Sequence, residues 1–569
     1  MTRPPGLAAN AVALLIAGLF GVATFAQDVT NSTVTVPGSS SARTLGSRLG
    51  QVINVMDYGA VGDGITNDWE AFQSAFSVAS AGGGHVYAPA KIFKLLVPHS
   101  SSGLTVPGNT SFQGEGSGRT VLRFYDSGQA LEMLRVTNPN CLLADFSIEN
   151  YGGPTPHVAI LVGSANNLAI NGVSIDGRSA AGATAHGIKV SDNSTATNVE
   201  ITRCLFYRCL YGIFTANSFA GPASDWRITN CTFSNNYADD LEFNAPHGIW
   251  TGVVVASCNF ESNQYVGPNA GLGVGLARVT NATITGNTFR TYTQDTIHLE
   301  DGCKGVAVIG NTLLLCKRGI TVSSSNTDQI VITSNSLQGA AESITREPHL
   351  GGAQTIGIQL VDDGSLFPRH CTVSNNVCRN YDTAVAVGRS AITSVVTNNH
   401  LLDSSVGLSC VPYSSISENR IEGCKYALQT SNFTGLVGKT VVRNCPNLFY
   451  ASTAKVTLLG LDIYVTDSSG ATNIWCRLFP APSKMNGESI GVVEAGPGWS
   501  MVTASALSFA TTLTETNHYR DSYGPLGGGS RNYGAPAPVD GNVYFYVYNP
   551  SHANPVEIQH TFSGAITFR

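Results

Sequence analysis

The chain is poor in charge, and beyond its first 26 residues it has no long hydrophobic run. Only 12% of its 569 residues are Asp, Glu, Lys or Arg, and the formal net charge is −6. A net negative charge gives no indication of a nucleic-acid partner. No segment after the N-terminus is apolar enough to cross a membrane. We therefore expect no nucleic-acid partner and no membrane span in the mature protein.

The cysteine spacing that would indicate metal or redox chemistry is also missing. The chain has 13 cysteines but no Cys-x-x-Cys. One slot of a sequence repeat instead holds Cys in early copies and Asn in later ones: Cys204, Cys231, Cys258, Asn287, Asn311, Asn335, Asn376, Asn399 and Asn419. We interpret this slot as an inward turn position, where Cys is a small apolar residue and Asn bonds the turn backbone. Local disulfides Cys204–Cys209 and Cys371–Cys378 remain alternatives.

The slot belongs to a short sequence motif that recurs along the middle of the chain. Each copy is an alternating apolar strand, then Asn or Cys, then Phe or Leu two positions later, as in Val199–Phe206 and Trp226–Phe233. The period is roughly 20–40 residues, which indicates a repeat architecture. One such unit cannot bury its own apolar face, so the units must stack. With 61 glycines for turns, the pattern predicts an all-β parallel β-helix, one coil per repeat, over residues 51–450.

The N-terminal segment has the pattern of a signal peptide. Arg3 precedes an apolar stretch at 11–20, and Thr24-Phe25-Ala26 suits cleavage. Residues 1–26 are therefore predicted to direct the protein to a secreted or periplasmic location, an uncleaved anchor being the alternative. Residues 27–50 are rich in Ser and Thr and are predicted to be a linker.

Two further elements flank the repeats. The stretch Trp69 to Ala79 is predicted to form a short amphipathic helix, with Trp69, Phe72 and Phe76 on one face. A β-helix has an open end with unpaired edges, so we expect this helix to cap it. Residues 455–569 read as antiparallel strands joined by Gly- and Pro-rich loops, which predicts a β-sandwich. This second domain is expected to bind carbohydrate or to form a homotrimer.

At the start of the repeats the sequence resembles a known group. The segments "MDYGAVGDGITND", "AFQSAF" and "GGGHVYAPA" resemble the N-terminal module of the pectate-lyase-like superfamily of right-handed parallel β-helices. That group includes polygalacturonase-related hydrolases, polysaccharide lyases, alginate epimerases and phage tailspike depolymerases. The preceding "SARTLGSRLGQVINV" is most similar to tailspike-type members. The resemblance implies a right-handed β-helix and a polysaccharide partner, and leaves the reaction open.

A second strand signature predicts which side chains face outward. Strict alternation places Ile188, Ile213, Leu241, Val274, Ile297, Ile320 and Ile358 inside. One outward column is then Lys189, Phe214, Glu242, Gly275, His298, Thr321 and Gln359. A second predicted outward column is Gly187, Gly212, Asp240, Gly273, Thr296, Gly319 and Gly357.

Acidic residues gather on two of these strands. Segments 239–242 and 295–301 hold Asp, Glu or His at seven of eleven positions, whereas only 38 of 569 residues are acidic overall. Gly273 and Gly275 lie between the two segments and are expected to leave a hollow, with the acidic strands roughly 10 Å apart. The predicted catalytic residues are Asp239, Asp240, Glu242, Asp295, His298 and Glu300. Lys189, His186, Arg318 and Gln359 are predicted to bind substrate.

The acidic cluster indicates glycoside hydrolysis, which needs one carboxylic acid and one carboxylate. The pairing is open, because the two groups could lie across the hollow or within one strand, as Asp240 and Glu242 do. Solvation of an acidic face, or binding of Ca²⁺ by oxygen ligands, is the plainer interpretation. No specific metal motif is present, so no cofactor is predicted. A polysaccharide lyase using Lys189, His298 or Arg318, and a non-catalytic glycan-binding β-helix, are the rival functions.

The sequence also departs from the members of the superfamily whose motifs it partly shares. Asp239-Asp240 and His186-Gly187 resemble pieces of polygalacturonases, but no Asn-x-Asp motif precedes Asp239, the order of the pieces differs, and no Arg-x-Lys motif follows. The Asp-Pro-His motif of alginate epimerases is absent as well. Galacturonan and alginate are therefore doubtful as substrates.

Overall fold

A computed structural model describes most of the repeat region and parts of both flanks. The described residues are 31–34, 42–44, 51–98, 102–125, 132–152, 157–178, 185–262, 271–324, 326–339, 355–361, 368–388, 393–410, 415–430, 437–438, 440–443, 447–449 and the strands named below after residue 450. Residues up to Ile53 and residues from Asn54 onward form two separate units. The predicted signal peptide lies outside the described residues. Of the predicted linker, β1 (Thr33–Val34) and β2 (Arg43–Thr44) are described and pair antiparallel.

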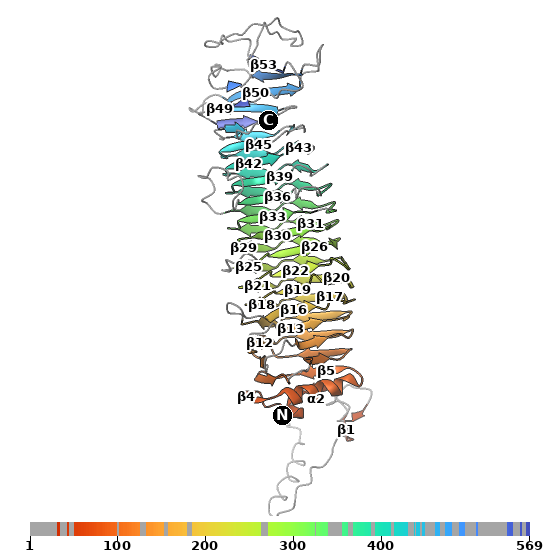
Figure 1. Ribbon diagram of the computed structural model, residues 1–569. Helices are drawn as coiled ribbons and strands as arrows, with labels where there is room; N and C mark the ends of the chain where they lie inside the picture. The colour runs from red at the N-terminus through yellow and green to blue at the C-terminus, as the bar shows by residue number, and fades with distance from the viewer. Residues whose placement is uncertain are drawn as a thin grey trace, which may run out of the picture. The chain divides into compact units, whose positions relative to one another are not determined.

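The second unit is built from coils that each add one strand to three parallel sheets (Figure 1). Sheet 1 has 14 strands: β7 (Leu104–Val106), β10 (Glu132–Val136), β13 (His157–Val162), β16 (Ala185–Val190), β19 (Ile213–Thr215), β22 (Leu241–Asn244), β26 (Val274–Ala277), β30 (Asp295–Glu300), β33 (Arg318–Val322), β36 (Ile356–Leu360), β39 (Thr383–Val387), β42 (Val406–Cys410), β45 (Tyr426–Thr430) and β48 (Asn447–Phe449). The coils are right-handed, as parallel crossovers nearly always are. The predicted all-β parallel β-helix is confirmed.

Sheet 2 has 15 strands: β4 (Asp63–Asn67), β6 (Ile92–Leu96), β9 (Val121–Tyr125), β12 (Ser147–Asn150), β15 (Ser174–Asp176), β18 (Leu205–Tyr207), β21 (Thr232–Ser234), β25 (Asn259–Glu261), β29 (Thr288–Arg290), β32 (Thr312–Leu314), β35 (Ser336–Gln338), β38 (Val377–Arg379), β41 (His400–Leu402), β44 (Arg420–Glu422) and β47 (Val441–Arg443). All of its pairings are parallel, so its outer face is a continuous ladder along the coils.

Sheet 3 holds β5 (Gly84–Tyr87), β8 (Thr110–Gln113), β11 (Cys141–Ala144), β14 (Leu168–Asn171), β17 (Thr197–Thr202), β20 (Pro222–Thr229), β24 (Val254–Ala256), β28 (Thr283–Thr285), β31 (Ala307–Ile309), β34 (Val331–Thr333), β37 (Thr372–Ser374), β40 (Val395–Thr397), β43 (Ser415–Ser417) and β46 (Val437–Gly438). The long strand β20 pairs with β23 (Ile249–Thr251) at its start and with β24 at its end, and β23 pairs with β27 (Val279–Thr280). A short β3 (Val52–Asn54) and the 3₁₀ helix η1 (Val55–Tyr58) precede the coils.

The repeated motif is the corner between sheet 3 and sheet 2. β17 ends at Thr202, Arg203 turns the chain with φ 53°, and β18 begins at Leu205. Cys204, in the slot, is buried. Asn230 and Ser257 repeat the left-handed turn one and two coils later, with φ 54° and 55°. Because one residue adopts this left-handed conformation, the two strands meet at a sharp corner without a longer loop between them.

The slot forms the predicted ladder along this corner. The backbone N–H of Asn287 donates to Oδ1 of Asn311 at 3.0 Å, and its side chain donates to Val255 O at 2.9 Å. The pattern repeats at each Asn of the slot up to Asn419. In the early coils the Cys231 N–H approaches Cys258 Sγ at 3.4 Å. The structural interpretation of the slot is therefore confirmed.

The alternative of local disulfides is wrong. Cys204, Cys209, Cys371 and Cys378 are all free and buried. Burial raises the pKa of the Cys209 and Cys378 thiols far above its usual value. These side chains therefore stay protonated and serve as packing residues.

Aromatic rings fill the core beside sheet 2. Phe206, Phe233, Phe260 and Phe289 stack one per coil, with ring centroids 4.7, 4.7 and 4.5 Å apart. That distance is the spacing of parallel strands, so each coil adds one ring to the column. All four are buried.

The helix α2 spans Trp69–Ser80, close to its predicted bounds. Its buried Phe72 packs against Phe93 at 5.1 Å between centroids, and Phe76 packs against Phe112 at 5.4 Å. The N-cap residue is Asp68, whose carboxylate accepts from the N–H groups of Val61 and Gly62 instead of capping the helix. The helix and its apolar face are confirmed, whereas its role as a cap stays a prediction.

After residue 450 only strands are described. β49 (Leu461–Thr466), β50 (Asn473–Pro480), β51 (Ser489–Ala495), β53 (Val543–Asn549) and β55 (Ala565–Phe568) form an antiparallel sheet, and β52 (Ser508–Phe509) pairs with β54 (Ile558–Gln559). Antiparallel strands are thus present as expected, and the β-sandwich and its role stay predictions. None of the described helices has the length and apolar character that a membrane span requires.

Candidate active site on the outer face of sheet 1

The first predicted outward column is a row of register partners on sheet 1. Lys189 pairs with Phe214, Phe214 with Glu242, Glu242 with Gly275, and Gly275 with His298. Thr321 and Gln359 continue the row on β33 and β36. The predicted inward column is fully buried at all seven positions. This part of the alternation is confirmed.

The second predicted outward column is wrong, because it faces the interior. A Cβ on Gly187 would lie 2.8 Å from the Phe206 ring, and one on Gly212 would lie 2.7 Å from Phe233. A Cβ on Gly273 would lie 2.9 Å from Phe289 and 2.7 Å from Thr296 O. The aromatic column of sheet 2 fills this corner of each coil, which explains the glycines. Gly273 therefore leaves no hollow on the outer face.

Asp240 belongs to this inner column and is 3% exposed, so the prediction that it faces outward is wrong. Its Oδ1 accepts from Asn236 Nδ2 at 2.6 Å, and its Oδ2 accepts from the buried Tyr292 hydroxyl. Burial raises the pKa of Asp240 to about 7, against the lowering effect of those two hydrogen bonds. Asp240 thus supports β22 from behind, and this position cannot touch a polymer on the outer face.

Asp239 and Glu242 are half-buried carboxyl groups: Asp239 lies two residues before β22, and Glu242 lies within it. Each of the two carboxyl groups affects the pKa of the other, and Asp239 Oδ1 accepts from the Leu272 N–H at 2.6 Å. Burial and the charge of Asp239 raise the pKa of Glu242 well above its usual value. Burial also raises the pKa of Asp239, opposed by the Leu272 N–H. The pair therefore retains one proton to a higher pH than ordinary carboxyl groups do, and this proton resides mainly on Glu242.

The strand β30 supplies the opposite side of the cluster. His298 Nε2 lies 3.7 Å from Glu300 Oε2 and 2.9 Å from Ser323 Oγ, and its Nδ1 lies 4.0 Å from Asp295 Oδ2. Burial raises the pKa of Glu300. Asp295 is 8% exposed, accepts from Thr321 Oγ1 at 2.5 Å, and lies 3.8 Å from Arg318 Nη1. Asp295 and Arg318 thus fix one another beside His298.

Aromatic side chains adjoin the cluster on the preceding strands. His186 stacks on Tyr211 and on Phe214, with centroids 5.4 and 5.0 Å apart, and Tyr211 stacks on Phe214 at 4.2 Å. Burial, then Lys189, lowers the pKa of His186 to about 4, so this ring is uncharged at neutral pH. Burial and the nearby Glu242 raise the pKa of Tyr211. We name His186, Tyr211 and Phe214 the aromatic cluster.

Seven of the predicted site residues therefore separate into three groups. Asp239, Glu242, His298 and Glu300 come together, Asp295 and Arg318 support them, and Asp240 lies behind the sheet. Lys189 and Gln359 lie in the same outer column but at either end, on β16 and β36. Sequence reasoning missed Tyr211, and it gave Phe214 no role although Phe214 stood in the outward column.

Metal binding has little support in the described part of the chain. There, no group of three or more His, Cys, Asp or Glu side chains is arranged to hold a metal ion. The cluster on sheet 1 is held by hydrogen bonds and ion pairs among its own members. The absence of a cofactor stays a prediction.

Comparison with known proteins supports the superfamily resemblance. Residues 52–321 match the family model described as rhamnogalacturonase A/epimerase, pectate lyase-like. The recognition of a pectate lyase-like parallel β-helix is thereby confirmed for this stretch, which contains the whole acidic cluster.

Individual relatives match shorter stretches. Mannuronan C5-epimerase AlgE2 of Azotobacter vinelandii is 41% identical over 76 residues, 13% of this chain and 8% of that protein. The preneck appendage protein of Bacillus phage PZA is 34% identical over 103 residues, 17% of this chain and 11% of that protein. The matched stretches thus span about a tenth of these relatives' lengths.

Solved structures resemble the chain more broadly but at low identity. The N-terminal fragment of bacteriophage phi29 gene product 12 covers 70% of this chain and 71% of its own, with TM-score 0.48 and 17% identity. The tailspike protein of E. coli bacteriophage HK620, in complex with a pentasaccharide, covers 95% of this chain and 97% of its own, with TM-score 0.49 and 11% identity.

Proposed function

We propose that this protein is a polysaccharide-degrading enzyme, a glycoside hydrolase whose active site is the acidic cluster on the outer face of sheet 1. The observation that carries the proposal is the pair of half-buried carboxyl groups of Asp239 and Glu242, which together keep a proton, with a third carboxyl group, that of Glu300, two strands away on β30. Glycoside hydrolysis needs one protonated carboxyl and one ionised carboxyl on opposite sides of the bond to be cleaved.

The arrangement suggests a role for each group. Glu242 is the general acid, because burial and Asp239 favour its protonated form. Glu300 is the base that activates water, and His298 at 3.7 Å orients its carboxylate. Glu242 and His298 are separated by Gly275, two strand spacings of about 4.8 Å, so the acid and base can reach the roughly 6.5–9.5 Å of inverting enzymes.

Gly275 and the aromatic cluster give such a site room and a binding surface. A Cβ on Gly275 would lie 3.0 Å from Leu272 Cδ1 and 3.7 Å from Glu242 Cγ, so a longer side chain there would crowd the acid. Phe214 is the register neighbour of Glu242. Aromatic rings bury the apolar faces of ligands at little cost in conformational entropy. We expect Phe214 and Tyr211 to support the sugar next to the cleaved bond.

The test is a product assay on a panel of plant and bacterial polysaccharides. The full chain is expected to release new reducing ends without the ultraviolet absorbance of an unsaturated uronate. Glu242→Gln and Glu300→Gln should each lower the rate about 10²–10⁴-fold, the usual contribution of general acid–base catalysis. Glu261→Gln, on the outer face of sheet 2, is the matched control and should retain full activity.

Two outcomes would favour the rival functions. Absorbance of an unsaturated product would indicate a lyase, in which a cation stabilises the charge formed beside the uronate carboxyl. Binding of a polymer without any product would indicate a non-catalytic glycan-binding β-helix. Near-full activity of both carboxamide variants would place the site elsewhere.

A further inference from the structure

The outer face of sheet 2 carries a second surface, in the N-terminal coils, with the opposite charge character. Lys94 and Arg123 are register partners on β6 and β9, and Arg123 pairs in turn with Glu149 on β12. Tyr125, Tyr151, Arg178 and Arg208 lie at or just beyond the C-terminal ends of β9, β12, β15 and β18. We call Lys94, Arg123, Tyr125, Tyr151, Arg178 and Arg208 the tyrosine–cation ladder.

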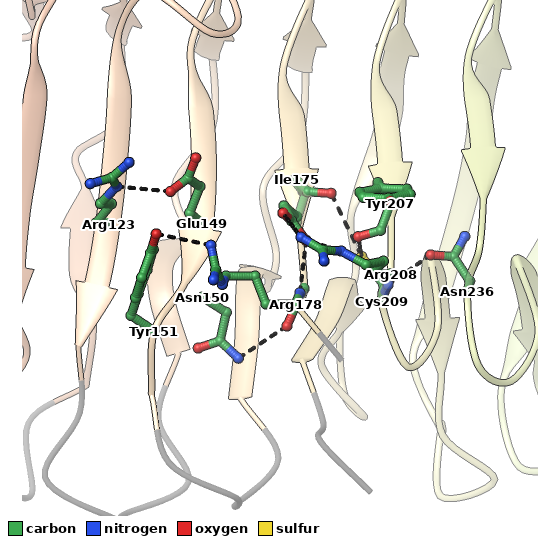
Figure 2. Close-up of polar contacts among 12 residues, drawn as sticks. Arg123, Glu149, Asn150, Tyr151, Ile175, Arg178, Tyr207, Arg208, Cys209 and Asn236 are labelled. Atoms are coloured by element: carbon green, nitrogen blue, oxygen red, sulfur yellow. Dashed lines mark hydrogen bonds and ion pairs between the residues drawn. The ribbon is translucent and has the colours of Figure 1, made fainter. Parts of the chain in front are cut away.

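The rings and cations of this ladder hold one another in place. Tyr125 and Tyr151 stack with centroids 4.9 Å apart. Lys94 Nζ lies 5.3 Å from the Tyr125 centroid, and the guanidinium carbons of Arg123 and Arg178 lie 5.3 and 4.1 Å from that of Tyr151. Arg178 Nη1 also donates to the Tyr151 hydroxyl at 2.9 Å (Figure 2). Each ring thus fixes the cation beside it.

The charges of the ladder do not cancel. Arg123 Nε lies 2.8 Å from Glu149 Oε2 (Figure 2). Arg208 is paired with Asp176, Nε donating to Oδ1 at 3.0 Å. In the part of the chain that the structure describes, neither Lys94 nor Arg178 has a carboxylate within ion-pair distance. Four cations therefore face two carboxylates, on a chain whose net charge is −6.

We propose that the tyrosine–cation ladder binds an acidic polysaccharide chain that runs along the coils. The reason is charge complementarity with regular spacing. Successive strands lie about 4.8 Å apart, which is close to the length of one sugar unit. Guanidinium groups bind carboxylates through two parallel hydrogen bonds. Because the stacked tyrosines already immobilise these cations, binding costs little additional side-chain entropy.

This surface is distinct from the acidic cluster. The cluster lies on sheet 1 and would repel a polyanion through Asp239, Glu242 and Glu300, whereas the ladder attracts one on sheet 2. The ladder therefore does not depend on the proposed hydrolysis. It would hold the protein on an anionic glycan while sheet 1 acts on a polymer or a polymer segment of lower charge.

Affinity electrophoresis of the full chain in native gels tests the proposal. The probe is polygalacturonate, and dextran is the neutral control polymer. Polygalacturonate should retard the protein, and added salt should weaken the retardation because exposed charges are screened. The double variant Lys94→Gln/Arg178→Gln should bind with a Kd about three- to tenfold higher, as expected for the loss of one half-buried and one exposed cation. Glu242→Gln should be retarded as the wild type is.

The matched control is Arg290→Gln, an exposed arginine on β29 of the same sheet, outside the ladder. It removes one cation and should bind within twofold of the wild type. Equal retardation of the double variant and the control would overturn the proposal, since the ladder cations would then contribute no more to binding than a cation elsewhere on the sheet. The proposal would also be wrong if dextran retarded the protein as strongly as polygalacturonate, or if neither polymer did.

Discussion

The Tyr292 hydroxyl donates a hydrogen bond to Oδ2 of Asp240, which lies two coils earlier, and both side chains are buried. Asn236 donates to the other carboxylate oxygen. This network lies directly behind Asp239 and Glu242. It therefore fixes the start of β22, and with it the position of the two carboxyl groups on the outer face.

Replacing Asp240 with Asn should change how stability depends on pH. The pKa of Asp240 is raised from 3.8 to about 7 in the folded protein. Its folded state therefore binds the proton more tightly, and the wild type loses stability as pH rises from about 4 to about 7. Asn cannot ionise, so the variant should lack this loss, roughly 4 kcal/mol at most at about 1.4 kcal/mol per pKa unit. Urea midpoints at pH 4.5 and 7.5 measure the difference, and a gap between variant and wild type that is the same at both values would contradict it.

The pH dependence of the rate should reflect the raised carboxyl pKa values. Glu242 must be protonated and Glu300 must be ionised. Activity should therefore fall when the pH rises above the pKa of Glu242, and also when the pH falls below the pKa of Glu300. Because burial raises both, the optimum should lie closer to neutrality than it would for ordinary carboxyls near pH 4. In Asp239→Asn the negative charge beside Glu242 is gone, so the alkaline limb should move to lower pH. If the alkaline limb of the pH–rate profile is unchanged in Asp239→Asn, Glu242 is not the general acid.

Two substitutions in the corner ladder should differ in cost. Asn311→Ala removes the partners of the buried Asn287 N–H and of Ile284 O. Two orphaned buried groups should lower the free energy of unfolding by about 2–5 kcal/mol. Cys231→Ala deletes one small side chain and should cost about 1 kcal/mol. Denaturant unfolding compares the variants, and folded Cys231→Ala should turn over substrate normally. A lower rate of the folded Cys231→Ala protein would argue that the slot also has a functional role.

Two glycines of sheet 1 should respond differently to Ala. A Cβ on Gly319 would lie 2.2 Å from Gly357 O and 2.5 Å from Leu337 Cδ2, so Gly319→Ala should cost about 1–3 kcal/mol by overpacking. A Cβ on Gly275 meets only the end of the Leu272 side chain within 3.4 Å, so Gly275→Ala should fold with little loss. Its effect should appear in KM or kcat, because the methyl group lies beside Glu242. Thermal melting and steady-state rates separate the two, and equal melting temperatures would contradict the inward orientation of Gly319.

The repeat made the coil predictable. The slot residue, the turn before it and the Phe two positions later recur with each coil, so Cys204 and Asn287 could be assigned to a buried corner without coordinates. The same holds for the column from Lys189 to Gln359, whose register follows from aligning the strand signatures. Because the strands pair in parallel without a shift in register, residues at the same position of successive repeats lie next to one another in the sheet.

The site was only half predictable for a related reason. Strict alternation places Asp240 and Gly273 on the outer face, but each strand of sheet 1 is entered from a tight corner at which two successive residues point inward. Only the packing of Phe206, Phe233 and Phe289 against that corner shows this. The interaction between the carboxyl groups of Asp239 and Glu242 and the contact of His298 with Glu300 likewise depend on side-chain positions.

The parallel β-helix and the acidic patch on sheet 1 could be inferred from the sequence alone, because the strand repeat recurs along the chain and the acidic residues cluster within it. Which of the acids reach solvent and which are buried behind the sheet depends on how the coils pack, as the buried Asp240 shows. The structure also shows that Tyr151 and Arg178, which are 27 residues apart in the chain, are in contact in the tyrosine–cation ladder of sheet 2. The stacking of successive coils brings such residues within one strand spacing of one another. Which of their side chains are then in contact depends on packing and cannot be inferred from the order of residues in the chain.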